Sequence, residues 1–173
     1  KERAELLPVF SQLNREGVIR IYDAHLRGAD MRGITLIRKN LKDSDLTGAD
    51  LEDARLDQVG FDGSILDEVN FEGAILQRCD LRRASSTQAC RWYESILDGV
   101  RVPTFKKLGL DCTYLTAESN DWVRAQYVFR IFKEAYKREG DHDSAGLFYE
   151  REMDMKRAQA KGVDRLWYLA LWA

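Results

Sequence analysis

The sequence has few cysteines, prolines and histidines, no long apolar run and almost no net charge. Its 173 residues include three cysteines, two prolines and two histidines. Cys79, Cys90 and Cys112 form no CxxC motif and have no histidine at the spacing of a zinc site. An odd, sparse set of cysteines favours a reducing compartment over a disulfide framework as the basis of the fold.

Charge and hydropathy narrow the function classes further. The chain carries 29 acidic and 27 basic side chains, for a formal net charge of −2, which indicates neither a nucleic-acid binder nor an acidic tail. It has no run of about 20 apolar residues, so no segment of it is long enough to span a bilayer. There is no signal peptide, and the chain begins at Lys1, which leaves open that it is a fragment.

What the chain does have is a large apolar residue at every fifth position. The series is Leu26, Met31, Leu36, Leu41, Leu46, Leu51, Leu56, Phe61, Leu66, Phe71, Leu76 and Leu81. Two residues before each member stands a small or apolar residue, from Ala24 to Cys79, with Lys39 as the one charged exception. Helices repeat every 3.6 residues and strands every 2. A period of five with two inward positions predicts a β solenoid, in which each short side ends in a turn.

The phrases "LRGADM", "LTGADLEDARL" and "FEGAILQRCDL" resemble the A(D/N)LXX signature of pentapeptide-repeat proteins over roughly residues 21–102. The resemblance implies a right-handed quadrilateral β-helix with 20 residues in each coil and coils about 4.8 Å apart. Residues 24–83 would form three complete coils. After "RRASSTQAC" the period resumes one residue late, with large residues at Trp92, Leu97 and Val102, which predicts a bulge or small loop at 84–89.

Outside the repeats the periodicity is helical. We expect five segments: an N-terminal helical cap at 1–20, the pentapeptide-repeat β-helix at 21–102, a linker at 103–118, an α-helical hairpin at 119–160 and an apolar segment at 161–173.

The hairpin is predicted from two helical stretches separated by Gly140, a helix-stopping residue. Its aromatic residues should lie between the helices or against the last coil: Trp122, Phe129, Phe132, Phe148 and Tyr149. The run Asp141-His142-Asp143 contains metal-binding residue types, but a turn whose aspartate caps the second helix explains it better.

The phrase "FYEREM" carries a second resemblance, to a helical hairpin that follows pentapeptide repeats in some bacterial membrane proteins. In those proteins a two-span, channel-like segment comes next. The resemblance implies that "RLWYLALWA" is juxtamembrane, with Trp167, Tyr168 and Trp172 as candidate membrane-proximal residues, because aromatic side chains concentrate at the headgroup layer. It also implies a cytoplasmic location, at the inner face of the membrane. No span is present, so ion conduction is not implied.

Charges are unevenly distributed if the period is unbroken. Two adjacent sides of the coil carry an excess of acids, and we call these residues the acidic side: Asp30, Asp45, Asp50, Glu52, Asp53, Asp67, Glu68 and Glu72. The two remaining sides have an excess of cations, counting Lys39 among the outward charges. Asp30 should stack on Asp50, and Glu52 on Glu72, which is mildly destabilising. That cost indicates a basic protein partner.

These patterns lead to a functional hypothesis with an alternative. We find no Ser-His-Asp set, phosphate-binding loop or catalytic carboxylate pair, so we expect no enzyme, no cofactor and no metal. The first hypothesis is a protein-interaction or regulatory module, the cytosolic part of a membrane-anchored, channel-like bacterial protein. The alternative is a DNA mimic, because pentapeptide proteins that protect topoisomerases against quinolones resemble this chain and present acids in place of phosphates. An unassigned scaffold and the oligomeric state are left open, and direct nucleic-acid binding is not expected.

Overall fold

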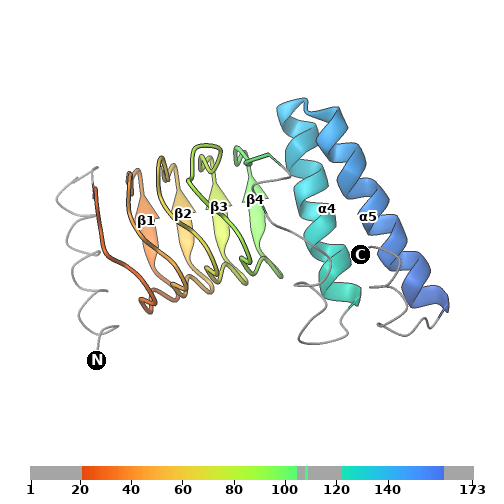
Figure 1. Cartoon of the computed structure of the whole chain (residues 1–173), viewed down its shortest axis with the longest axis horizontal. Helices are drawn as coiled ribbons and strands as arrows, with labels where there is room; N and C mark the ends of the chain where they lie inside the picture. The colour runs from red at the N-terminus through yellow and green to blue at the C-terminus, as the bar shows by residue number, and fades with distance from the viewer. Residues whose placement is uncertain (1–20, 105–107, 109–121, 162–173) are drawn as a thin grey trace. The chain divides into compact units, whose positions relative to one another are not determined.

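The computed structural model describes residues 21–104, 108 and 122–161, which belong to two separate compact units divided between Gly109 and Leu110 (Figure 1). The predicted cap at 1–20, most of the predicted linker at 103–118 and residues 162–173 lie outside the described residues, including Trp167, Tyr168 and Trp172.

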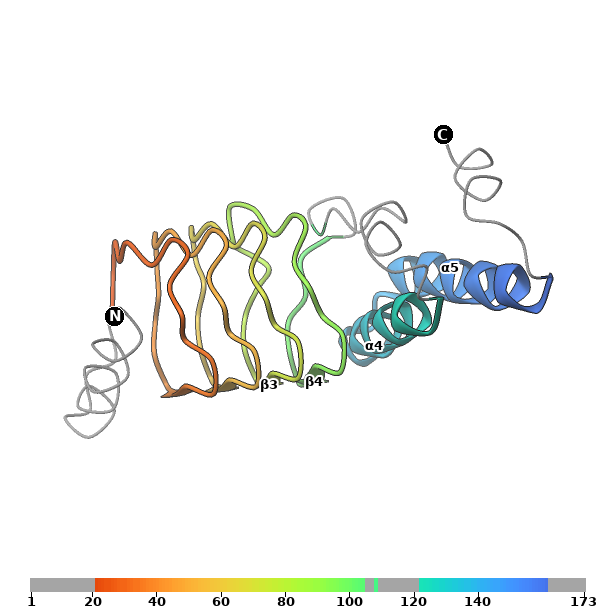
Figure 2. The ribbon, with the colours of Figure 1, turned by 90° about the horizontal axis from the view of Figure 1, so that it is seen from below.

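The first unit is a β-helix of stacked coils (Figure 2). One side of each coil is a short strand: β1 (Thr35–Ile37), β2 (Arg55–Asp57), β3 (Ile75–Gln77) and β4 (Ile96–Asp98). The strands pair in parallel in the order β1-β2-β3-β4, with the central leucines in register: Leu36, Leu56, Leu76 and Leu97. The predicted β solenoid is therefore confirmed, and isolated parallel bridges join the coils on the other sides.

Both predicted inward series fill the interior. All large residues of the series from Leu26 to Leu81 are at most 6% exposed, and the small series is buried from Ala29 to Cys79. Large side chains stack on one another between coils, as the rings of Phe71 and Trp92 do at a centroid distance of 4.4 Å. Burial of two apolar positions in every five, without an interior helix or second sheet, gives this unit its core.

Each repeat ends on a residue with positive φ, which turns the chain at the corner. The residue two places after each large inward residue has φ between 52° and 72°, from Asp23 to Gly99, whether or not it is glycine. Arg83 is the exception among the described corners, and the extra residue of the predicted bulge follows it. Ser85 is exposed and donates its backbone N–H to Ser64 O at 2.8 Å, while Ser86 pairs with Ile65. The bulge therefore increases the sequence separation of paired residues from 20 to 21.

Two expectations about charged side chains in the β-helix are wrong. Lys39, counted among the outward charges, is 3% exposed because it occupies an inward position, and burial lowers its pKa. The acidic side was expected to lie fully outside. Only Asp53 and Glu68 of its members are exposed, and the others are half-buried.

The second unit is a helical hairpin of α4 (Trp122–Glu139) and α5 (His142–Lys161), as predicted. Gly140, at φ 79°, ends α4 in a Schellman motif, in which the N–H of Asp141 donates to Tyr136 O at 3.0 Å. Asp141 then caps α5 by accepting the backbone N–H of Ser144 at 3.0 Å, and this bond lowers the pKa of Asp141. The capping interpretation of Asp141 fits this geometry.

The aromatic contacts between the helices centre on Phe148. Its ring lies 6.0 Å from that of Phe129, 5.7 Å from that of Phe132 and 5.2 Å from that of Tyr136. Tyr149 was predicted in this interface, but it is 52% exposed, with the Lys133 ammonium 5.8 Å from its ring centre. The side chain of Trp122 lies outside the described residues.

A buried carboxylate also joins the two helices. Glu152 accepts hydrogen bonds from the ammonium groups of Lys133 and Lys156, each at 2.7 Å. Burial alone would raise the pKa of Glu152, but these two bonds lower it, so the carboxylate is held ionised. The "FYEREM" phrase thus supplies an aromatic residue and an ion pair to the hairpin itself.

Replacing Phe61 with alanine should lower the free energy of unfolding of the β-helix by about 3 to 5 kcal/mol, because the side chain is fully buried and its removal leaves a cavity between coils. Ile65→Ala is the control, since Ile65 is 38% exposed and should cost about 1 kcal/mol or less. Denaturant unfolding of the two variants measures the difference. Equal losses would contradict the stacked interior.

Candidate protein-binding surface

The acidic side combines three positions of the repeat. The turn position, directly before the large inward residue, holds Asp30, Asp45 and Asp50. The position directly after the inward residue holds Glu52, Asp67 and Glu72, and the left-handed corner position holds Asp53 and Glu68. Because each position has its own backbone geometry, the acids differ in how much of their charge is free for a partner.

Side chains at the turn position hold the backbone. An aspartate or asparagine there accepts the N–H of the residue two places on, at distances of 2.9 to 3.3 Å, in Asp30, Asn40, Asp45, Asp50, Asn70 and Asp80. Such bonds stabilise turns. In Asp45 the hydroxyl of Thr47 adds a second donor, and together they lower its pKa. Asp30, Asp45 and Asp50 therefore have a structural role.

The predicted stack of Asp30 on Asp50 is present, but its repulsion is neutralised. The two residues pair across coils, and Asn70 pairs with Asp50 above them. The Arg32 guanidinium lies 2.8 Å from Asp30 and 3.5 Å from Asp50, and its bond to Asp30 raises the pKa of Arg32. Asn70 donates its side-chain N–H to Asp50 Oδ1 at 2.8 Å. The column of Asp30, Asp50 and Asn70 therefore has no uncompensated charge repulsion that a partner would have to relieve.

Asp67 is also engaged inside the chain. Its carboxylate accepts a short hydrogen bond from the Ser86 hydroxyl and the backbone N–H of Gln88 at 2.8 Å. In the part of the chain that the structure describes, Glu52, Asp53 and Glu68 form no ion pair. We call these three residues the free acids.

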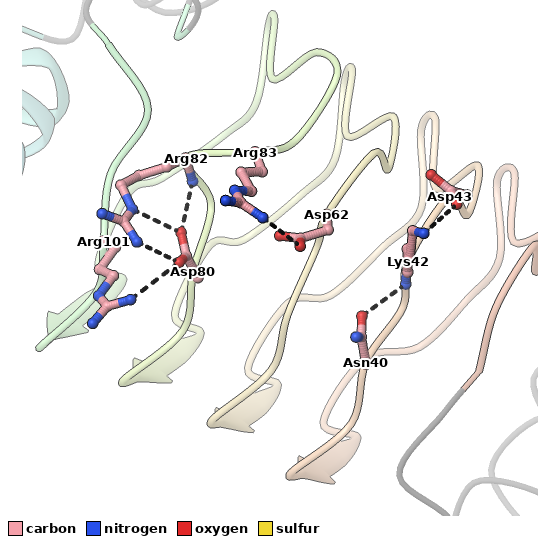
Figure 3. A network of polar contacts seen from close by, with 8 residues as sticks. All are labelled: Asn40, Lys42, Asp43, Asp62, Asp80, Arg82, Arg83 and Arg101. Atoms are coloured by element: carbon pink, nitrogen blue, oxygen red, sulfur yellow. Dashed lines mark hydrogen bonds and ion pairs between the residues drawn. The ribbon is translucent and has the colours of Figure 1, made fainter.

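The side of the coil that carries Leu41, Phe61 and Leu81 neutralises its own charges (Figure 3). Asp80 pairs with Arg82 at 2.8 Å and with Arg101 at 3.5 Å, and Arg83 pairs with Asp62 at 3.6 Å. Burial acts to raise the pKa of Asp80, but the bonds from Arg82 and Arg101 lower it. Most pairs join neighbours along the chain or different columns, so this side offers little unneutralised charge.

The interior offers no reactive group in the described residues. Cys79 and Cys90 are buried, and burial raises the pKa of Cys79 to about 11 and that of Cys90 further still. A thiol with a raised pKa is a poor nucleophile. Across 21–104 and 122–161, no group of three or more His, Cys, Asp or Glu side chains is arranged to hold a metal ion. The outer side chains of this unit stand in columns, because the coils pair in register.

Sequence reasoning missed the side formed by β1–β4. Its turn positions hold Thr35, Arg55, Ile75 and Ile96, with no aspartate or asparagine, so the chain stays extended as a strand. The absence of Asp and Asn from the turn position at every fourth repeat, with β-branched residues at three of the four positions, was the signal that could have identified this side.

Comparison with known proteins agrees with this geometry. Residues 24–63 and 64–85 match the pentapeptide-repeat family, with eight copies of the repeat. A search of curated proteins found no match. Similar solved structures include the pentapeptide-repeat protein Rfr23 from the cyanobacterium Cyanothece 51142, at 29% identity and a TM-score of 0.45, covering 47% of this chain and 55% of that one.

Two further similar structures are HetL and QnrB1. HetL, a pentapeptide-repeat protein involved in heterocyst differentiation regulation from Nostoc sp. strain PCC 7120, is 20% identical, with 49% of this chain and 43% of that chain covered and a TM-score of 0.40. QnrB1, a plasmid-mediated fluoroquinolone resistance protein, is 18% identical, with coverages of 50% and 45% and a TM-score of 0.36. This chain spans about half the length of these proteins.

Asn70→Asp should lower the free energy of unfolding by about 2 kcal/mol near neutral pH, because it removes the donor to Asp50 and stacks a second carboxylate on it. The repulsion raises the pKa of the new carboxyl, so its penalty should shrink as the pH falls through about 4. Denaturant unfolding at several pH values measures this.

Asn40→Asp is the matched control for that variant. Asn40 occupies the same position and makes the same backbone bond, but it pairs with Gly60 rather than with a carboxylate. Its cost should stay below about 0.5 kcal/mol. Similar costs for both variants would show that the column of Asp30, Asp50 and Asn70 is not a coupled unit.

Proposed function

We propose, from the premise that residues 24–85 are pentapeptide repeats, that this chain is a non-catalytic module that binds a protein partner through the outer side chains of its β-helix. One observation carries the proposal. The interior is filled by stacked apolar residues, while three carboxylates on one side are left out of the internal ion pairs and turn bonds.

The free acids define the kind of partner. Glu52 follows the turn residue Asp50, and Asp53 and Glu68 stand at left-handed corners, exposed to solvent. Corners project furthest from the coil axis, so a flat or convex basic surface can reach them without deforming the backbone. A partner with lysine or arginine side chains at matching spacing would be steered to this side, with a strong dependence on ionic strength.

Neutralising the free acids should remove this binding. The test compares the parent chain with the triple variant Glu52→Gln, Asp53→Asn, Glu68→Gln in quantitative affinity capture from extracts of the source cells. Proteins held by the parent at about 0.15 M salt should fall at least about tenfold with the triple variant.

The control neutralises three other exposed acids of the β-helix: Asp23→Asn, Glu94→Gln and Asp98→Asn. Both triple variants change the net charge equally, so a general charge effect would lower capture in both. Specific binding by the free acids requires that only the first variant loses the partner.

The DNA mimic is the second candidate, favoured by the gathering of the free acids on one side. Mimicry needs several regularly spaced charges where phosphates would lie. Here Asp30, Asp45, Asp50 and Asp67 direct their oxygens to internal donors, and Glu72 also has an interaction partner. Three of the eight acids are left for that role. Purified DNA gyrase distinguishes the candidates: a mimic should bind it and be displaced by duplex DNA, whereas a module for another basic protein should not.

We further propose that the module works in the cytoplasm, at the inner face of a bacterial membrane. The support is the likeness of "FYEREM" to hairpins of membrane-anchored repeat proteins and the aromatic sequence after residue 161. In the described parts of the chain, neither α4 nor α5 is long and apolar enough to cross a bilayer. We place the attachment in the segment with Trp167, Tyr168 and Trp172 or in sequence beyond it.

Liposome flotation tests this location. The full chain should float with vesicles of anionic lipid, and a chain truncated before residue 165 should remain in the soluble fraction, because buried aromatic rings contribute most of the interfacial affinity. Trp167→Ser with Trp172→Ser in the full-length chain should lose most of the flotation as well. If all three proteins float equally poorly, the membrane proposal is wrong and the protein-binding proposal stands by itself.

A further inference from the structure

The side formed by β1–β4, which we call the sheet face, differs from the other three sides of the coil. Those sides end in tight turns, six of them held by Asp or Asn at the turn position, whereas the strands of the sheet face are joined by a continuous parallel ladder. The sheet face is therefore a flat surface whose outward side chains form two straight columns.

One column exposes isoleucine where the fold does not require it. Ile75 and Ile96 pair directly across β3 and β4, and Ile96 is 52% exposed. Ile37, in the other column, is 45% exposed. A β-branched residue suits an extended strand, but threonine meets that need equally well, as Thr35 shows in β1. Ile96 and the half-buried Ile75 beside it present apolar area that contact with another molecule would remove from water.

The same face holds two cations without an internal carboxylate. Arg55 pairs with Ile75 in the strand register, and Arg38 follows Ile37 at the corner of β1. Both are exposed, and within residues 21–104 neither forms an ion pair. Most other cations within residues 21–104 are paired, for example Arg27 with Asp45, Arg32 with Asp30 and Arg78 with Asp57, and Arg91 is an exception. Asp98, at the end of β4, is an exposed carboxylate that forms no ion pair within residues 21–104. The unneutralised positive charge therefore lies at the β1–β2 end of the sheet face, beside the apolar area of β3 and β4.

We propose that the sheet face is a docking surface for an acidic protein segment, whose carboxylates pair with Arg38 and Arg55 while its apolar side chains cover Ile75 and Ile96. Charge complementarity selects this occupant. A second copy of the chain, face to face, would bring like cations together, and a basic partner would be repelled. The occupant therefore differs from the basic partner of the free acids, and the two surfaces together make the chain a bridge between an acidic and a basic protein.

The test uses a synthetic peptide of about ten residues that alternates leucine with glutamate, the spacing that matches a strand face. Analogues with glutamine or lysine in place of glutamate test the charge. Binding to the full-length, isotope-labelled chain is followed by NMR. The glutamate peptide should shift backbone amides in 35–38, 55–58, 75–78 and 96–98, and the lysine peptide should not.

Variants then separate the charged and apolar contributions. Arg38→Gln with Arg55→Gln should weaken the glutamate peptide at least about tenfold at low salt and remove most of its salt dependence. Ile75→Thr with Ile96→Thr should weaken it by about tenfold, since threonine keeps the strand and loses the apolar contact. The control is Arg91→Gln with Ile65→Thr, an unpaired arginine and a 38% exposed isoleucine on other sides, which should stay within about twofold.

Several results would overturn the proposal: equal binding of the lysine peptide, amide shifts confined to other sides, an equal loss in the control variant, or self-association through the sheet face in sedimentation. The NMR amide shifts are measured on the chain without substitutions. They therefore test the proposal even if a substitution perturbs folding. The free-acid variant Glu52→Gln, Asp53→Asn, Glu68→Gln leaves the sheet face unchanged. Its result therefore reports on the proposed function independently of this one.

Discussion

The β-helix depends on backbone hydrogen bonds between coils, which join residues about 20 positions apart. Leu26 N–H donates to Asp45 O, Leu46 N–H to Ile65 O, and the same pattern continues to the last described coil. These bonds place each position of the repeat directly over its equivalent in the neighbouring coil. Interior packing, turn bonds and surface charge all follow from this stacking. Each depends on the column of equivalent residues in successive coils rather than on one residue.

The column principle explains which parts of the fold were predictable. Inward positions could be read from a period of five, since burial depends only on where a residue falls in the repeat. The hairpin could be read from Gly140 and Asp141, whose preferences at helix ends are local. Tyr149 was misplaced because the helical period alone does not decide which of the neighbours Phe148 and Tyr149 faces the other helix. In the structure Tyr149 is 52% exposed, with the Lys133 ammonium 5.8 Å from its ring centre.

The positions of the charged side chains in the repeat could be read from the sequence. Whether each charge is paired inside the chain or exposed to solvent could not. The acids of the acidic side occupy outward positions of the repeat, but the engagement of Asp30 and Asp50 depends on backbone N–H groups two residues on and on the reach of Arg32. Lys39 shows the reverse failure. A lysine is expected to be exposed to solvent, but the repeat position of Lys39 points into the coil. The side chain is therefore buried, and burial lowers its pKa.

The single inserted residue shows how such a fold can vary its surface without losing its core. Ser85 is the inserted residue, and from Ser86 onward paired residues are 21 positions apart in the sequence instead of 20. Trp92 nevertheless stacks on Phe71, and Leu97 pairs with Leu76. Each coil contacts only its neighbours, so the disturbance is absorbed at one corner. The same locality lets the turn position differ from side to side. On three sides, Asp and Asn at the turn position use their polar groups to hold the backbone, whereas β-branched or long residues at that position produce one flat side with apolar area and charge left for another molecule.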